Sequence, residues 1–101
     1  MIARLWHGYT RPENAGTYQE MLLTNILPGI HRVPGYKGSY VLRKDGEDEV
    51  EFITLTFWEP LDAVRQFAGQ DYERAVIIPE AAALLTRHDE RSAHYESFRS
   101  D

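Results

Sequence analysis

The sequence contains no cysteine among its 101 residues. This absence excludes disulfide bonds, a thiolate nucleophile, iron–sulfur clusters and cysteine-ligated zinc. Residues 1–7 carry no basic region followed by an apolar run, so they lack the pattern of a secretory signal. No apolar stretch approaches the roughly 20 residues that a membrane-spanning helix needs. We therefore expect a cytoplasmic protein without a membrane partner.

Positive charge is also scarce. The chain has 11 lysines and arginines against 16 acidic residues, a net charge of −5, and its basic residues form no cluster. Because non-specific nucleic-acid binding needs a basic face, we expect no nucleic-acid partner. Hydrophobic residues make up 43% of the chain, which is enough for a folded core, and the length predicts a single domain over residues 1–101.

Motifs that hold phosphates, metals or an activated serine are absent as well. The chain has no P-loop, no dinucleotide-binding glycine motif and no nucleophile elbow. Its histidines include no HxxxH pair, and His88 and His94, roughly 20 Å apart along an extended strand, cannot share an ion. We therefore expect no metal and no cofactor.

The most informative feature that is present is a strand that turns directly into a helix, residues 50–67. Its first half, Val50–Trp58, is rich in β-branched and aromatic residues and is apolar on both faces. A strand of this kind has something packed on each side. The helices of this short chain can cover one side, so the other side predicts a second subunit.

Local patterns predict an alternation of strands and helices. Strands are expected at residues 2–9, 36–43, 50–58 and 88–98, with a charged hairpin turn at 44–48. A first helix is expected to begin near Thr10–Glu13 and to end at Pro28–Gly29, while Gly69 and Pro79 divide a second helical region into segments at 61–68, 72–77 and 80–85.

This order predicts an α+β, ferredoxin-like fold of the split βαββαβ type, with a four-stranded antiparallel sheet. The first and third strands are expected at its centre, and the helices on one face. The open face then predicts a homodimer, in which two sheets pack face to face as a dimeric α/β barrel.

Together these residues resemble proteins of the antibiotic-biosynthesis-monooxygenase type, a family of dimeric α/β barrels. The resemblance covers nearly the whole chain and rests on Pro34-Gly35-Tyr36, Gly38, the run Thr54–Glu59 and Phe67. It implies a small enzyme related to cofactor-independent oxygenases of polycyclic phenols and to heme-degrading enzymes.

The heme-degrading branch of that family is not expected here. Its members carry an Asn on the first strand, a Trp in the second helix and a heme-ligating His further along. By spacing, those positions correspond to His7, Phe67 and Ile77 in this chain. None of the three matches, and an isoleucine cannot ligate iron.

His7 is the first candidate for a catalytic residue. It shares a strand face with Ala3 and Leu5, and we expect that face to point towards the helices. A histidine there is able to act as a general base near neutral pH. Either His94 or Tyr95 should share this face, and His94 is the second catalytic candidate. The alternative for His7 is a structural hydrogen bond to a neighbour, and the alternative for His94 is a solvent-exposed sheet edge among the charged residues around it.

Four apolar and aromatic residues are candidates for substrate binding between sheet and helices: Trp58, Phe67, Tyr72 and Ile77. The alternative is that they only fill the core. We expect a cofactor-independent monooxygenase that acts on a small aromatic or polyketide-type molecule. Two alternatives stay open, a non-catalytic dimeric barrel that binds a small apolar ligand and an isomerase or cyclase on the same scaffold.

Overall fold

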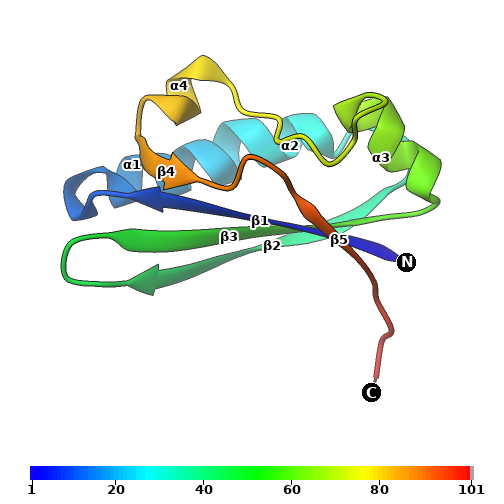
Figure 1. Cartoon of the computed structure of the whole chain (residues 1–101), viewed down its shortest axis with the longest axis horizontal. Helices are drawn as coiled ribbons and strands as arrows, with labels where there is room; N and C mark the ends of the chain where they lie inside the picture. The colour runs from blue at the N-terminus through cyan, green and yellow to red at the C-terminus, as the bar shows by residue number, and fades with distance from the viewer. Residues whose placement is uncertain (101) are drawn as a thin grey trace.

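The computed structural model describes residues 1–100 as one antiparallel sheet with helices on one side (Figure 1). The strands are β1 (Ile2–Thr10), β2 (Tyr36–Asp45), β3 (Val50–Trp58), β4 (Leu85–His88) and β5 (Ala93–Glu96). The helical elements are α1 (Pro12–Met21), the π-helical η1 (Leu22–Ile26), α2 (Leu27–Ile30), α3 (Leu61–Ala68) and α4 (Pro79–Ala82). Among the described residues no helix is long and apolar enough to cross a membrane.

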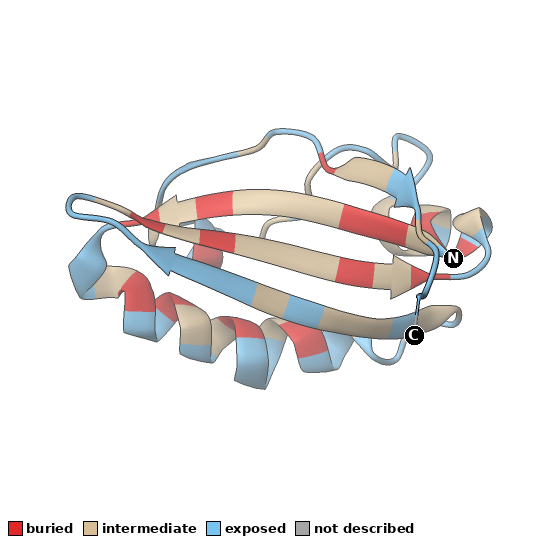
Figure 2. Ribbon diagram, turned by 90° about the horizontal axis from the view of Figure 1, so that it is seen from below, coloured by how far each residue is buried: buried red, intermediate tan, exposed pale blue. Residues whose placement is uncertain are grey.

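The sheet has the strand order β2-β3-β1-β4, and β5 also pairs with β1. The prediction that the first and third strands are central is confirmed. All helices lie on one face of the sheet (Figure 1), and no helix crosses in front of the strands in the view from below (Figure 2). The α+β, ferredoxin-like fold predicted from the sequence is therefore present.

The last predicted strand, 88–98, is two short strands instead of one. β4 pairs with one end of β1 and β5 with the other, so they share the place of a fourth strand at this edge. Between them the ladder is replaced by Asp89, whose backbone N–H bonds the carbonyl of His7 at 2.9 Å and whose Oδ2 accepts from the His7 backbone N–H at 3.0 Å. A carboxylate that takes a strand hydrogen bond interrupts the regular pairing.

The first helix does not end at Pro28–Gly29 as predicted but continues to Ile30. Proline normally breaks a helix because it lacks an N–H and its ring meets the carbonyl four residues earlier. Here a π-helical turn precedes it, with the Leu27 N–H bonded to the carbonyl of Leu22, five residues back. This wider turn moves the preceding carbonyls away from the Pro28 ring, so the helix continues past Pro28.

The helical segment predicted at 72–77 is also wrong, because residues 69–78 contain turns and extended backbone. Their hydrogen bonds run across to the β4–β5 connection: Ala75 N–H donates to the carbonyl of Glu90 at 3.0 Å, and Ser92 N–H to that of Glu73 at 2.6 Å. The following helix, α4, is shorter than predicted. The prediction for α3, by contrast, is confirmed at both ends.

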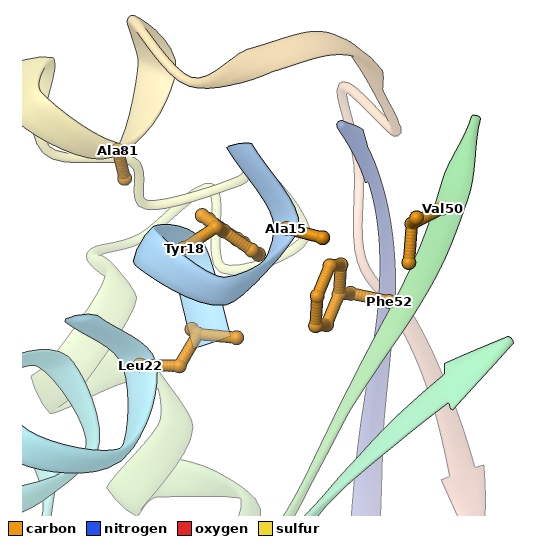
Figure 3. Packing of buried hydrophobic residues seen from close by; sticks show 6 residues of the cluster. All are labelled: Ala15, Tyr18, Leu22, Val50, Phe52 and Ala81. Carbon is orange, nitrogen blue, oxygen red and sulfur yellow. The ribbon is translucent and has the colours of Figure 1, made fainter. Parts of the chain in front are cut away.

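The core consists of two clusters between the helices and the sheet. Figure 3 shows the larger one, in which Tyr18 of α1 meets Phe52 of β3 edge to face at 5.0 Å, with Ala15, Leu22, Val50 and Ala81 around them. The smaller cluster contains Trp58, Ala63 and Val64. Residues from the margins of both clusters enclose the cavity described next.

Candidate active site

A cavity of about 340 Å³ lies between the helices and the sheet. Its floor is the central part of β1 and β3, and its roof comes from α1, η1, α2, α3, α4 and the non-helical segment before Pro79. The lining is mostly apolar: Arg4, Trp6, Tyr18, Leu22, Asn25, Ile26, Gly29, Ile30, Val33, Thr54, Thr56, Phe67, Val76, Ile77, Ile78, Ala81 and Ser92. Its volume lies near the lower end of the roughly 300–1,000 Å³ usual for small-molecule sites.

The face of β1 that looks into the cavity carries Arg4 and Trp6, not His7. Side chains alternate along a strand, so His7 points to the open face together with its cross-strand partner Ile53. The prediction that His7 faces the helices is therefore wrong. Its premise was that the more apolar of two alternating faces meets the helices. Here the face with Ala3 and Leu5 is the one that the chain's own helices leave uncovered.

On the open face, His7 forms a pair with a carboxylate. Its Nδ1 lies 2.7 Å from Asp89 Oδ2, and both side chains are partly exposed. The same Asp89 joins the two faces, because its backbone carbonyl accepts a 2.7 Å hydrogen bond from Trp6 Nε1. His7 thus lies on the central strand β1, beside the gap between β4 and β5, and does not line the cavity.

His94 lies on the cavity side of the sheet, opposite Arg4 in the β1–β5 register. Of the two alternatives predicted for the last strand, Tyr95 and not His94 shares the face of His7, so the two candidate catalytic histidines do not lie in one pocket. His94 Nε2 is 3.0 Å from Arg4 Nη1. Arginine can only donate, so Nε2 accepts and the ring proton belongs on Nδ1. His94 Nδ1 is buried without a hydrogen-bond partner among the described residues.

Burial lowers the pKa of His94 below its ordinary value, and the positive charge of Arg4 adds to this effect. The imidazole is thus neutral near pH 7, and its one lone pair is taken by the guanidinium. In this arrangement His94 orients Arg4 and has no free nitrogen with which to accept a substrate proton.

Arg4 is the main polar group of the cavity, and the sequence analysis did not single it out. Only 5% of its surface is exposed. Its Nη1 also donates to the carbonyl of Tyr72, its Nη2 donates to that of Arg74 at 3.2 Å, and its guanidinium lies 5.6 Å from the centre of the Phe67 ring. Within residues 1–100 no carboxylate forms an ion pair with it. Burial lowers the pKa of Arg4 to about 10, so it remains charged at neutral pH.

The four predicted substrate-binding residues divide into two pairs. Phe67 and Ile77 line the cavity. Trp58 is fully buried behind Phe67, with the two rings stacked at 5.2 Å, and Tyr72 packs edge-on against His94 at 5.0 Å. Trp58 and Tyr72 therefore support the wall from outside. Contact of any of the four with a substrate stays a prediction.

The other polar groups of the cavity lining are uncharged and include the Asn25 amide and several hydroxyls. Thr56 Oγ1 accepts a 2.8 Å hydrogen bond from Trp58 Nε1, and Thr54 Oγ1 is buried with no partner among the described residues. Burial raises the pKa of Tyr18 to about 12, which keeps its phenol protonated. The cavity thus combines an apolar body with one uncompensated positive charge.

No family model matches the sequence, and no curated protein matches it. Solved structures match it along its length. SnoaB, a cofactor-independent oxygenase from Streptomyces nogalater, has a TM-score of 0.66 at 17% identity, covering 98% of this chain and 95% of its own. The monooxygenase from the gene ActVA-Orf6 of Streptomyces coelicolor, in complex with nanaomycin D, has a TM-score of 0.62 at 14% identity. This match covers 99% of this chain and 89% of the monooxygenase.

The heme-degrader MhuD from Mycobacterium tuberculosis, with two hemes in its active site, has a TM-score of 0.62 at 19% identity and covers 100% of this chain and 99% of its own. These matches show that the chain has the fold of the antibiotic-biosynthesis-monooxygenase-like proteins. The lining of this cavity does not suit a heme, because its described residues include no His, Cys or Met to ligate iron, and its Tyr18 is held protonated.

Proposed function

We propose that the protein is a cofactor-independent monooxygenase acting on a small aromatic or polyketide-type molecule. The observation that carries this proposal is the apolar cavity with the buried cation Arg4, in a fold shared with SnoaB over 98% of this chain. Apolar walls suit a ring system, and a fixed positive charge suits an anion that forms on it.

The reaction that fits such a site needs no redox group of the protein. An acidic phenol or an activated ring CH₂ loses a proton to solvent water, and the resulting anion is stabilised by the Arg4 charge. The anion then transfers electrons to O₂, and a C–O bond forms at the ring carbon. For a CH₂ that becomes C=O, one oxygen atom stays in the product and the other leaves as water, so substrate and O₂ balance without a further reductant.

Oxygen uptake tests the proposal. A suitable probe is 1,8-dihydroxy-9-anthrone, whose ring CH₂ is acidic and whose oxidation to the quinone changes its absorbance. We expect the protein to accelerate O₂ consumption over the buffer rate, with one O₂ used per quinone and one atom of ¹⁸O₂ in the product. A chelator should not change the rate. No acceleration over heat-inactivated protein, across several such phenols and anthrones, would reject this function.

A non-catalytic ligand binder is the second candidate. It is favoured because the described residues that line the cavity include no free base: His7 lies elsewhere and His94 is bonded to Arg4. Stoichiometric binding of the same compounds without consumption of O₂ would support it. Conversion of the ligand without O₂ would instead indicate an isomerase or cyclase.

We also propose a homodimer through the open face of the sheet. This face carries large apolar side chains on neighbouring strands, among them Tyr40 and Leu42 of β2, which are 65% and 47% exposed. Leu5 and Leu55 lie beside Tyr40 in the register of β1, β3 and β2. Exposed apolar patches of this kind mark interaction sites.

A further inference from the structure

We propose that Arg4 is the anion-binding residue of the cavity, and that the natural ligand presents a carboxylate or phenolate oxygen to it from an apolar ring. This inference deepens the proposed function. It rests on that function in one respect, the assumption that the cavity is the substrate site. It defines the ligand class by charge: an organic anion in preference to a neutral ring of the same size.

The first argument is the state of the Arg4 charge. A buried ion is costly unless it is paired and fully hydrogen-bonded. The protein supplies two carbonyl oxygens and one imidazole nitrogen, all of them neutral acceptors. Of the five N–H donors of a guanidinium, these contacts leave the one on Nε and one on Nη2 without a partner among residues 1–100. A ligand oxyanion would satisfy both the donors and the charge.

The second argument is the choice of His94 as the neighbour of Arg4. A carboxylate at this position would hold the guanidinium equally well but would also neutralise it. Neutral His94 accepts the hydrogen bond and leaves the positive charge available. Glu73, whose negative charge acts on the pKa of His94, lies 3.7 Å from Arg91 and forms no ion pair with Arg4 among the described residues.

The third argument is the shape of the site. Arg4 of β1 and the Phe67 ring of α3 lie 5.6 Å apart in the cavity wall. The rest of the lining includes Leu22, Ile26 and Ala81, which offer no charge. A ligand with one anionic edge and an apolar body of about two or three fused rings is suited to a cavity of this size.

A structural role of Arg4 is the competing explanation, because its bonds to Tyr72 and Arg74 also hold the segment before Pro79 against the sheet. The experiment must therefore measure ligand charge preference rather than stability. Isothermal titration calorimetry with 2-naphthoate and 2-naphthamide does so, since the two probes differ in charge but hardly in size. Neither probe needs oxygen or turnover.

We expect the wild-type protein to bind 2-naphthoate at least tenfold more tightly than 2-naphthamide. Arg4→Met should reduce this ratio to within twofold, and Arg4→Lys should retain part of it. Arg43→Met is the matched control, because Arg43 is ion-paired with Asp45 on the surface and does not line the cavity. Because the wild-type ratio is informative by itself, the test holds even if Arg4→Met does not fold.

A second arm separates phenolate from carboxylate ligands. Free and bound 4-nitrophenol are titrated by absorbance, and stabilisation of the phenolate by Arg4 should lower the pKa of the bound phenol in the wild type but not in Arg4→Met. A naphthoate preference alone supports a carboxylate ligand, and a pKa shift alone supports a phenolate ligand. The proposal is overturned if the wild type shows neither, or if Arg4→Met keeps both. An Arg4-dependent preference in a protein that consumes no O₂ would reject only the monooxygenase function.

Discussion

Arg4 and His94 are held in a reciprocal arrangement on neighbouring strands. The guanidinium needs an acceptor, and the imidazole provides one only while its Nε2 is unprotonated. Protonation of His94 would remove this acceptor and bring two positive charges within 3.0 Å of each other. The charge state of His94 therefore controls both the stability of this corner of the fold and the orientation of Arg4.

This arrangement predicts a pH dependence of stability. The pKa of His94 is lowered in the folded protein, so the unfolded chain binds its proton first as the pH falls. The free energy of unfolding should thus decrease as the pH drops below the ordinary histidine value of about 6.5, until the lowered folded-state pKa is passed. We expect urea midpoints to decline from pH 7 to pH 5, above the range in which carboxylates titrate.

His94→Asn tests the assignment, because an asparagine Oδ1 accepts from Arg4 but does not titrate. Its urea midpoint should change less over the same pH range than that of the wild type. An equal decline in both proteins would show that groups other than His94 cause the dependence.

His7 was predicted from the sequence as a catalytic base, but its position in the structure predicts no role in catalysis. Because its side chain lies on the open face, His7→Ala should leave the rate of O₂ uptake with a family-type phenol within about twofold of wild type. The backbone N–H of His7 would still bond Asp89, so the sheet edge should be retained. A loss of tenfold or more, in a variant with a wild-type circular dichroism spectrum, would restore His7 to the mechanism.

At the scale of elements, Gly35 shows how a turn closes the fold beside the cavity. It has φ of 91°, and its carbonyl accepts a 2.9 Å hydrogen bond from the Glu59 N–H at the entry to α3. A Cβ at this position would lie 2.4 Å from the Cβ of Ala63 and 2.8 Å from the carbonyl oxygen of Glu59. The turn therefore requires glycine for both conformation and space.

Gly35→Ala should accordingly lower the free energy of unfolding by about 1–3 kcal/mol, the usual cost of a strained backbone position. Gly16→Ala is the matched control within α1, where an added Cβ meets nothing within 4 Å. It should stabilise the protein by about 0.5–1 kcal/mol, because alanine is the better helix former. Chemical denaturation measures both. Similar effects of the two substitutions would contradict the role given to Gly35.

The elements differ in how far the sequence alone could predict them. β3 and α3 were predicted at their observed ends because each has a clear local signal, a β-branched run and a helical period between Pro60 and Gly69. The π-helical turn before Pro28 has a local hydrogen bond, from the Leu27 N–H to the Leu22 carbonyl, but the prediction followed the usual rule that proline ends a helix. The segment 69–78 depends on hydrogen bonds to the distant β4–β5 connection, which no local pattern contains. Arg4 was missed for a similar reason: a lone arginine in a strand indicates exposure until its tertiary acceptors are known.

At the scale of the whole molecule, the two faces of the sheet have different tasks. One face is covered by the helices and contains the cavity, and in the described part of the chain no helix covers the other face (Figure 2). That open face carries exposed apolar side chains such as Tyr40 and Leu42. A central strand such as β3 that is apolar on both faces is stable only if both are removed from water. This asymmetry is the physical reason to expect a second copy on the open face.

Leu42→Glu tests the dimer, because Leu42 lies on the open face and is 47% exposed. Leu23→Glu is the matched control: Leu23 is 51% exposed but belongs to η1, on the helical side. Light scattering after size-exclusion chromatography should give twice the 11.7 kDa chain mass for wild type and Leu23→Glu, and the chain mass for Leu42→Glu. A buried carboxylate without a partner would be too costly at the interface. A monomeric wild type at 100 μM would reject the dimer. A dimeric Leu42→Glu would move the interface away from this face.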